Sequence, residues 1–193
     1  MAHLVIEILC FKPSFFMTQL LSDTVETLLA EEGFKVDRVK PIVPATALDE
    51  DNTVTFRIFV KGHKGEWPCM VRCFENTSRV LVYSLYPDQV PEHLRSRMSE
   101  LICRINYGLI LGNFEMDWDD GELRYKTSID VEGFGLNSTI LRNLVYGNFH
   151  SFDLYFNALA LGMDTERDLD MIVMEAENPD MPKGFDLVDE IVH

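Results

Sequence analysis

The segment from residue 114 to 127, FEMDWDDGELRYKT, constrains the fold most strongly because a turn signal divides a regular alternation of apolar and polar residues. Asp120-Gly121 favours a two-residue type I′ turn, which requires positive φ at both positions. A loop of these two residues brings the halves together as antiparallel strands, with Trp118 opposite Leu123. The segment therefore predicts a β-hairpin.

The charged residues of this hairpin pair across it, with Glu115 opposite Lys126 and Asp117 opposite Arg124. Cross-strand pairs of opposite charge contribute roughly 0.2–1 kcal/mol each. A metal or catalytic carboxylate site would not place a cation opposite each carboxylate. The charged row is therefore interpreted as a solvent-exposed face that fixes the register, because a one-residue slip would bury every charge. The other face is predicted to be apolar and to contain Phe114, Met116, Trp118, Leu123 and Tyr125.

The remaining chain contains further helix and strand patterns joined by short loops. Helical spacing of apolar residues predicts helices over residues 14–32, from about 91 to 108, and 139–163. Alternation predicts strands over residues 34–43, 53–61, 67–75 and 79–86. Gly147-Asn148 could kink or fray the long helix. The order predicts an α+β fold, a twisted antiparallel sheet of about five strands flanked by helices.

The composition predicts one domain over residues 14–163, with a different segment at each side. Residues 1–13 could be a leader or an edge strand. Residues 164–193 contain ten Asp or Glu against two Lys or Arg. A weak apolar stripe predicts a helix over 165–177, and an acidic tail follows, for which disorder and docking are both open.

The net charge of −15 disfavours a nucleic-acid or anionic-membrane partner, because binding phosphates requires clustered Lys and Arg. The chain contains no run of 18 apolar residues, so no membrane helix is predicted. The first residues lack the basic region and the cleavage site of a signal peptide. The four cysteines lack metal-site spacing and are interpreted as small buried residues in a reducing compartment. A cytoplasmic protein is expected.

No pattern in the chain predicts catalysis, a cofactor or a metal site. There is no nucleophile elbow, no glycine-rich phosphate loop, and no pair of histidines at helical spacing. Phe149, Phe152 and Phe156 follow one face of the long helix, which is typical of a core face. The alternative is a pocket for a small ligand under that helix.

One surface of the predicted sheet is unusually apolar for a solvated face. It carries the alternate residues of the strands over 53–61 and 67–75, and arginines lie among its apolar side chains. Arginine and aromatic residues are enriched in protein–protein contacts. We therefore predict a protein-binding or dimer surface here, and cover by the tail or the first helix is the alternative. The predicted residues are Arg57, Phe59, Met70, Arg72 and Phe74.

The block from Val80 to Asp130 resembles the YbjN-like family, which is described as bacterial sensory transduction regulators. It combines a strand, a proline break, a helix ending in Asn106, a strand with the pattern G-x-F-x-x-D and a D-G turn. The likeness covers roughly residues 14–162. It implies a fold similar to type III secretion chaperones, often dimeric, in proteins that bind other proteins and have no known reaction.

The sequence and the resemblance together favour a cytoplasmic, non-enzymatic protein-binding module, chaperone-like or regulatory in sensing or stress responses. A homodimer and an unidentified protein partner are expected, with no catalytic residue and no cofactor. The alternative function is a small-ligand sensor that uses the pocket under the long helix.

Overall fold

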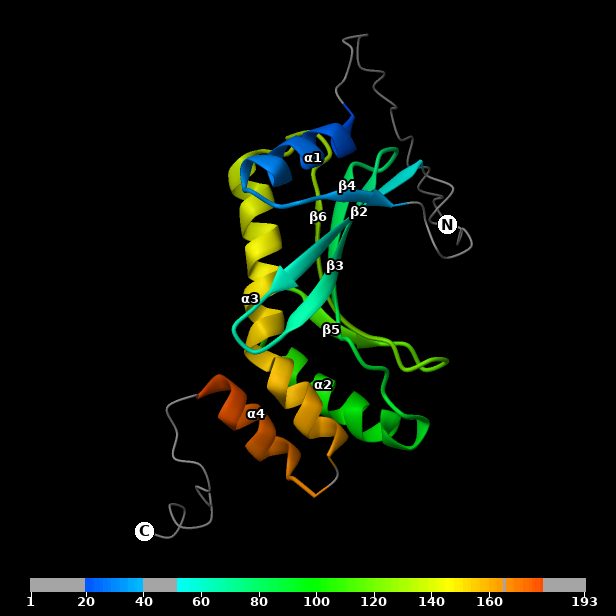
Figure 1. Cartoon of the computed structure of the whole chain (residues 1–193), viewed down its shortest axis with the longest axis vertical. Coiled ribbons are helices and arrows are strands. Elements are labelled where there is room, and N and C mark those ends of the chain that lie inside the picture. Colours follow the sequence, from blue (N-terminus) through cyan, green and yellow to red (C-terminus); the bar gives the residue numbers. More distant parts are fainter. Residues whose placement is uncertain (1–19, 40–51, 165, 179–193) are drawn as a thin grey trace, which may run out of the picture.

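The computed structural model describes residues 20–39, 52–164 and 166–178. These residues form one antiparallel sheet of six strands in the order β1-β2-β3-β4-β6-β5, together with helices (Figure 1). The predicted α+β class is confirmed. The strands are β1 (Asp37–Val39), β2 (Thr53–Lys61), β3 (Glu66–Phe74), β4 (Arg79–Leu85), β5 (Asn113–Met116) and β6 (Leu123–Asp130). The helices are α1 (Leu21–Glu31), a 3₁₀ turn η1 (Glu92–Leu94), α2 (Arg95–Gly108), α3 (Ser138–Met163) and α4 (Leu169–Glu177).

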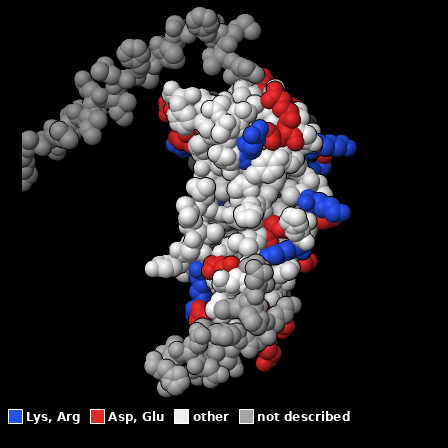
Figure 2. All heavy atoms as spheres, turned by 90° about the vertical axis from the view of Figure 1, so that its left-hand side faces the viewer, with Lys and Arg blue, Asp and Glu red and all other residues white. Residues whose placement is uncertain are grey.

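The helices leave one face of the sheet uncovered by any described helix. α1 and α3 lie against the other face, and α2 and α4 pack beside the C-terminal half of α3, next to β5 (Figure 1). Seen from the side of α1 and α3, the middle of the surface is largely uncharged, and acidic side chains gather toward the α1 end (Figure 2). Between its ends α3 carries only two charged residues, Arg142 and Asp153.

The core lies between α3 and the covered face of the sheet. Phe56, Val71 and Val82 are adjacent in the register of β2, β3 and β4, and each is fully buried. Trp67 lies near the start of β3 and is also fully buried, with its ring 4.9 Å from that of Phe152 on α3. These contacts remove a continuous apolar surface from water, which is the main favourable term in folding.

Local sequence signals set the ends of two helices. The side chain of Asn137 accepts a hydrogen bond from the backbone N–H of Ile140 at 3.0 Å, and so caps the start of α3. Gly33 follows α1 with φ +84°, which is the left-handed conformation that commonly ends a helix. Some predictions fall outside the described residues and are not tested. They concern residues 1–13, the start of the first helix at residue 14, strand residues 40–43 and the end of the tail.

Gly147-Asn148 does not interrupt or fray α3, contrary to one possibility raised from the sequence. The helix is continuous, and the Asn148 side chain is fully buried against the sheet. Its Oδ1 accepts a hydrogen bond from the Ser84 hydroxyl at 2.7 Å. Its Nδ2 is placed to donate to the backbone carbonyls of Val82 and Tyr125 and to the Thr127 hydroxyl, at 3.1–3.2 Å. One amide therefore ties α3 to β4 and β6.

The predicted register of the β5–β6 hairpin is wrong by two residues. Glu115 lies opposite Arg124, and Met116 lies opposite Leu123. The loop is longer than two residues, because the N–H of Gly121 donates to the carbonyl of Asp117 at 2.9 Å. A shift of two residues keeps every paired side chain on its predicted face, since strands alternate with period two. Trp118 is the exception, because it lies in the loop and is 56% exposed.

The outer edge of β5 is closed by a side chain of α2. The amide of Asn106 donates to the carbonyl of Phe114 at 3.0 Å and accepts from its N–H at 2.8 Å. An unpaired strand edge offers such backbone groups to other chains. Asn106 occupies these groups as a neighbouring strand would.

α4 contributes to the same core although it follows the predicted domain. Asp168 caps its start by accepting hydrogen bonds from two backbone N–H groups, at 2.9 and 3.1 Å. Leu169, Ile172 and Ala176 are buried against α2 and α3. The hydroxyl of Tyr155 on α3 donates to the Glu177 carboxylate at 2.8 Å.

Candidate functional site

The structure places all five predicted binding residues on the sheet face that no described helix covers. Arg57 lies opposite Met70 in the register of β2 and β3, and Arg72 lies one step along the same face. Phe59 and Phe74 lie toward the two ends of this row. We call these five residues, Arg57, Phe59, Met70, Arg72 and Phe74, the sheet-face patch.

The members of the sheet-face patch differ in accessibility. Phe59 is 69% exposed, and Arg57 beside it is exposed and forms a 3.5 Å ion pair with Asp37 of β1. Phe74 is only 8% exposed, and the Arg72 guanidinium lies over its ring at 5.2 Å. Phe59 and Arg57 are therefore the accessible part, and Phe74 supports the face from within.

Further residues of the same face were missed by the sequence reasoning. Leu81 lies opposite Arg72, and Tyr83 lies opposite Met70. The guanidinium of Arg124 lies over the Tyr83 ring at 4.6 Å, which extends the pattern of arginine beside aromatic residues into β6. The sequence of β4 could have indicated them. Its alternate residues on this face include Leu81, Tyr83 and Leu85, where a solvent-exposed face would carry polar side chains.

The charged row of the hairpin is a network of ion pairs on this same face. The carboxylate of Glu115 accepts hydrogen bonds from Lys126, from Arg124 at 3.0 Å and from Asn113 at 3.2 Å. Burial raises the pKa of Glu115, but the hydrogen bonds from Lys126, Asn113 and Arg124 outweigh it, and the net pKa is lowered. The carboxylate is held in its charged form by Lys126 and Arg124, so the row consists of ion pairs as predicted, although Glu115 is half-buried and Asp117 does not lie opposite Arg124.

Replacing Glu115 with Gln is expected to lower the free energy of unfolding by about 1 kcal/mol at pH 7. Because the folded pKa lies below the unfolded value, this stability is present above pH 4.5 and is lost as the pH falls through the folded pKa. Urea unfolding of both proteins between pH 7 and pH 3 measures it. The control Glu122→Gln, on the exposed 3.5 Å pair with Arg124, should change little. A difference that is constant with pH would contradict the assignment.

The three aromatic residues of α3 form core rather than line a pocket. Phe152 is fully buried and Phe149 is 8% exposed. The ring of Phe156 lies 5.0 Å from that of Tyr86 and 5.9 Å from that of Phe152. Rings at these separations are in direct contact. The predicted core face is confirmed, and the geometry does not favour the ligand-sensor alternative.

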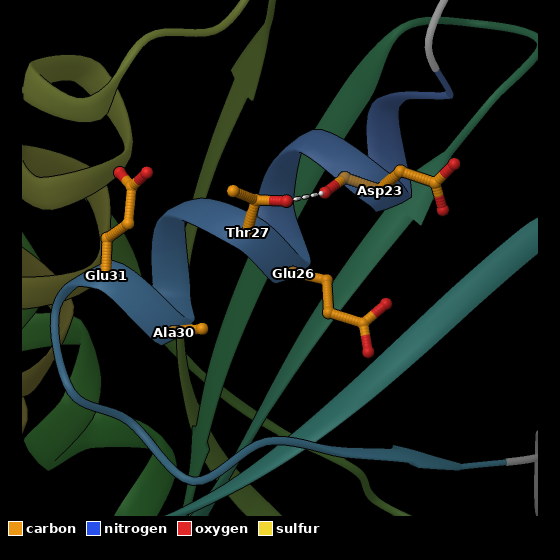
Figure 3. Close-up of a pocket in the computed structure, with 5 residues that line it drawn as sticks. All are labelled: Asp23, Glu26, Thr27, Ala30 and Glu31. Atoms are coloured by element: carbon orange, nitrogen blue, oxygen red, sulfur yellow. Dashed lines mark hydrogen bonds between the residues drawn. The ribbon is translucent and has the colours of Figure 1, made fainter.

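The carboxylates around a shallow hollow on α1 do not converge on a common point, as a metal or catalytic site would require. The hollow is lined by acidic residues and by Thr27 and Ala30, and the carboxylates of Asp23, Glu26 and Glu31 point away from one another (Figure 3). The Thr27 hydroxyl donates to the backbone carbonyl of Asp23 at 2.9 Å. Within the described ranges, no group of three His, Cys, Asp or Glu residues is placed to hold a metal ion.

The described cysteines are free thiols. Cys69 and Cys73 are fully buried on the core face of β3, as predicted, whereas Cys103 on α2 is exposed, so the predicted burial is wrong for Cys103. Burial raises the pKa of Cys73 to about 12, with the charge of Glu75 acting in the same direction. A thiol held in its protonated form is a poor nucleophile. These two core cysteines are suited to packing.

Comparison with known proteins identifies a family. In searches of curated proteins and of solved structures, no significant match was found. The likeness to type III secretion chaperones therefore stays a prediction. In the part of the chain that the structure describes, no helix has the length and apolar character that crossing a membrane requires. The model of the YbjN family, described as "Putative bacterial sensory transduction regulator", matches residues 21–161. This match runs from α1 to the end of α3, and the chain belongs to the YbjN family.

Proposed function

We propose that this chain is a cytoplasmic, non-enzymatic regulator that works by binding a protein partner through the sheet-face patch, in a chaperone-like manner. One observation carries the proposal. A sheet face that no described helix covers presents Phe59, 69% exposed, beside the exposed Arg57. Aromatic and arginine side chains supply most hot spots of protein interfaces.

The setting of the patch supports binding rather than catalysis. Its residues lie on the two long strands β2 and β3, which pair over nine positions. Such a rigid support reduces the ordering cost of association. The family is described as sensory transduction regulators, which agrees with a regulatory role. Self-association through the patch, giving a homodimer, is one form that the proposal takes.

Phe59→Ser is expected to weaken association by about tenfold or more, because truncating a hot-spot side chain costs at least about 1.4 kcal/mol. Sedimentation velocity measures self-association. Capture from a lysate of the source cell, repeated with the purified captured protein, measures partner binding. Phe74 is unsuitable for this test because it is buried, and its replacement would destabilise the fold.

The matched control is Phe134→Ser, which removes a ring that is 63% exposed in the connection between β6 and α3. It should leave association unchanged. The proposal is overturned if the wild-type chain neither self-associates nor captures a protein, or if Phe59→Ser binds as tightly as the control.

A further inference from the structure

The last turn of α2 and the connection to β5 expose three large apolar side chains within five residues. Tyr107 and Ile110 are each 96% exposed, and Leu111 is 65% exposed. Single exposed apolar residues are normal on protein surfaces, whereas several together indicate an interaction site. The position is separate from the sheet-face patch, because it lies at the C-terminal end of α2.

The backbone of this connection is anchored although its side chains are exposed. Asn106 before it binds both backbone groups of Phe114 after it, at 2.8 and 3.0 Å. The Tyr125 hydroxyl donates to the Leu111 carbonyl. Gly112 has φ +73°, and a Cβ there would lie 2.6 Å from the carbonyl oxygen of Lys126. An apolar projection that is already fixed loses little entropy on binding.

A groove between α2 and α4 lies next to this projection. It has a volume of about 480 Å³, and Tyr107 belongs both to its wall and to the projection. Methionine and valine give it an adaptable apolar surface that suits side chains of varied shape. The other lining residues are Cys103, Arg104, Asp170, Val173, Met174 and Glu177.

The charge of the groove is negative. Its Arg104 is engaged by two carboxylates, Glu100 at 2.6 Å and Asp170. Glu177 accepts a hydrogen bond from the Tyr155 hydroxyl, and no cation among the described residues forms an ion pair with it. The groove is lined by two carboxylates, Asp170 and Glu177, against the single Arg104, so its local field favours a cationic occupant. The complementary occupant carries Lys or Arg among apolar residues.

The shape of the site selects a helix as the occupant. Two helices form its walls, and an amphipathic helix binds such a groove with its apolar face. Strand addition at β5 is disfavoured because Asn106 already occupies the edge groups of Phe114. We propose that the projection (Tyr107, Ile110 and Leu111) and the α2–α4 groove together bind a cationic amphipathic helix of a partner protein.

The test uses the full chain and a fluorescent model peptide of about 20 residues, with Leu on one helical face and Lys on the other. Fluorescence anisotropy measures its binding. We expect Ile110→Ser combined with Leu111→Ser to weaken binding by about tenfold or more, and Glu177→Gln to weaken it several-fold and to reduce its salt dependence. Phe134→Ser should bind as the wild type does. Thermal unfolding checks that each variant is folded.

Several outcomes would overturn the proposal. The first is absence of binding by the wild-type chain. The second is that the Ile110→Ser, Leu111→Ser variant binds the peptide as tightly as the wild type does. A scrambled peptide of the same composition that binds the wild-type chain equally well is a further contradiction, since either result would indicate non-specific attraction to an acidic protein. The third is equal binding of a Leu/Glu peptide. The last is a wild-type dimer in sedimentation that the double variant dissolves, which would assign the projection to a second copy.

Discussion

Asn148→Ala is expected to lower the free energy of unfolding by about 3 kcal/mol. The Asn148 amide is fully buried, and its oxygen is the acceptor for the Ser84 hydroxyl at 2.7 Å. That hydroxyl in turn accepts from the Trp67 indole N–H at 2.8 Å. Truncation leaves the Ser84 proton without this acceptor in a dry interior and opens a cavity between α3 and the sheet. Urea unfolding monitored by circular dichroism measures the loss.

The control for this prediction is Asn157→Ala on the exposed side of the same helix. It makes the same chemical change without removing a buried network, and should alter the free energy of unfolding by less than about 0.5 kcal/mol. If Asn148→Ala changes stability as little as the control does, the buried network does not hold α3 on the sheet.

Gly121→Ala is expected to destabilise the protein by about 3 kcal/mol, and Gly133→Ala by only about 1 kcal/mol. Both glycines have nearly the same φ, +80° and +81°. A Cβ on Gly121 would lie 2.2 Å from the carbonyl oxygen of Val90, whereas a Cβ on Gly133 would meet no atom within 4 Å. The pair separates the cost of a left-handed backbone from the cost of a steric clash.

Val90 cannot move away cheaply, because its side chain is 1% exposed and its N–H donates to the Gly121 carbonyl at 2.9 Å. The difference between the two variants in urea unfolding should therefore be about 2 kcal/mol. Equal losses would show that the segment around Val90 adjusts without cost, and that only the backbone conformation matters at Gly121.

The sequence predicts the strands well because alternation reports directly which side chains face the core. Phe56, Ile58 and Val60 on β2 are buried as their spacing indicates. The hairpin register was wrong because local polar contacts outweigh the Asp-Gly turn preference. The carboxylates of Asp117 and Asp120 accept hydrogen bonds from backbone N–H groups two residues later, both at 2.8 Å. Such side-chain contacts stabilise a longer turn.

The candidate site was only partly predictable. The faces of Arg57 and Phe59 follow from alternation, but alternation does not show that Phe74 is only 8% exposed. The role of Asn148 depends on the meeting of β4, β6 and α3, which are far apart in the sequence. The projection formed by Tyr107, Ile110 and Leu111 was not singled out, because exposure of a loop side chain depends on how the backbone is anchored.

The Asn106 contact has a consequence for strand pairing between copies of the chain. An unpaired strand edge beside exposed apolar side chains promotes aggregation, because the edge can form backbone hydrogen bonds with another copy of the chain. Here the amide of Asn106 satisfies the Phe114 backbone only a few residues from Ile110 and Leu111. Because Asn106 occupies the backbone groups of Phe114, pairing of a second copy at this position is disfavoured, whereas the side chains of Ile110 and Leu111 stay accessible to the proposed partner helix.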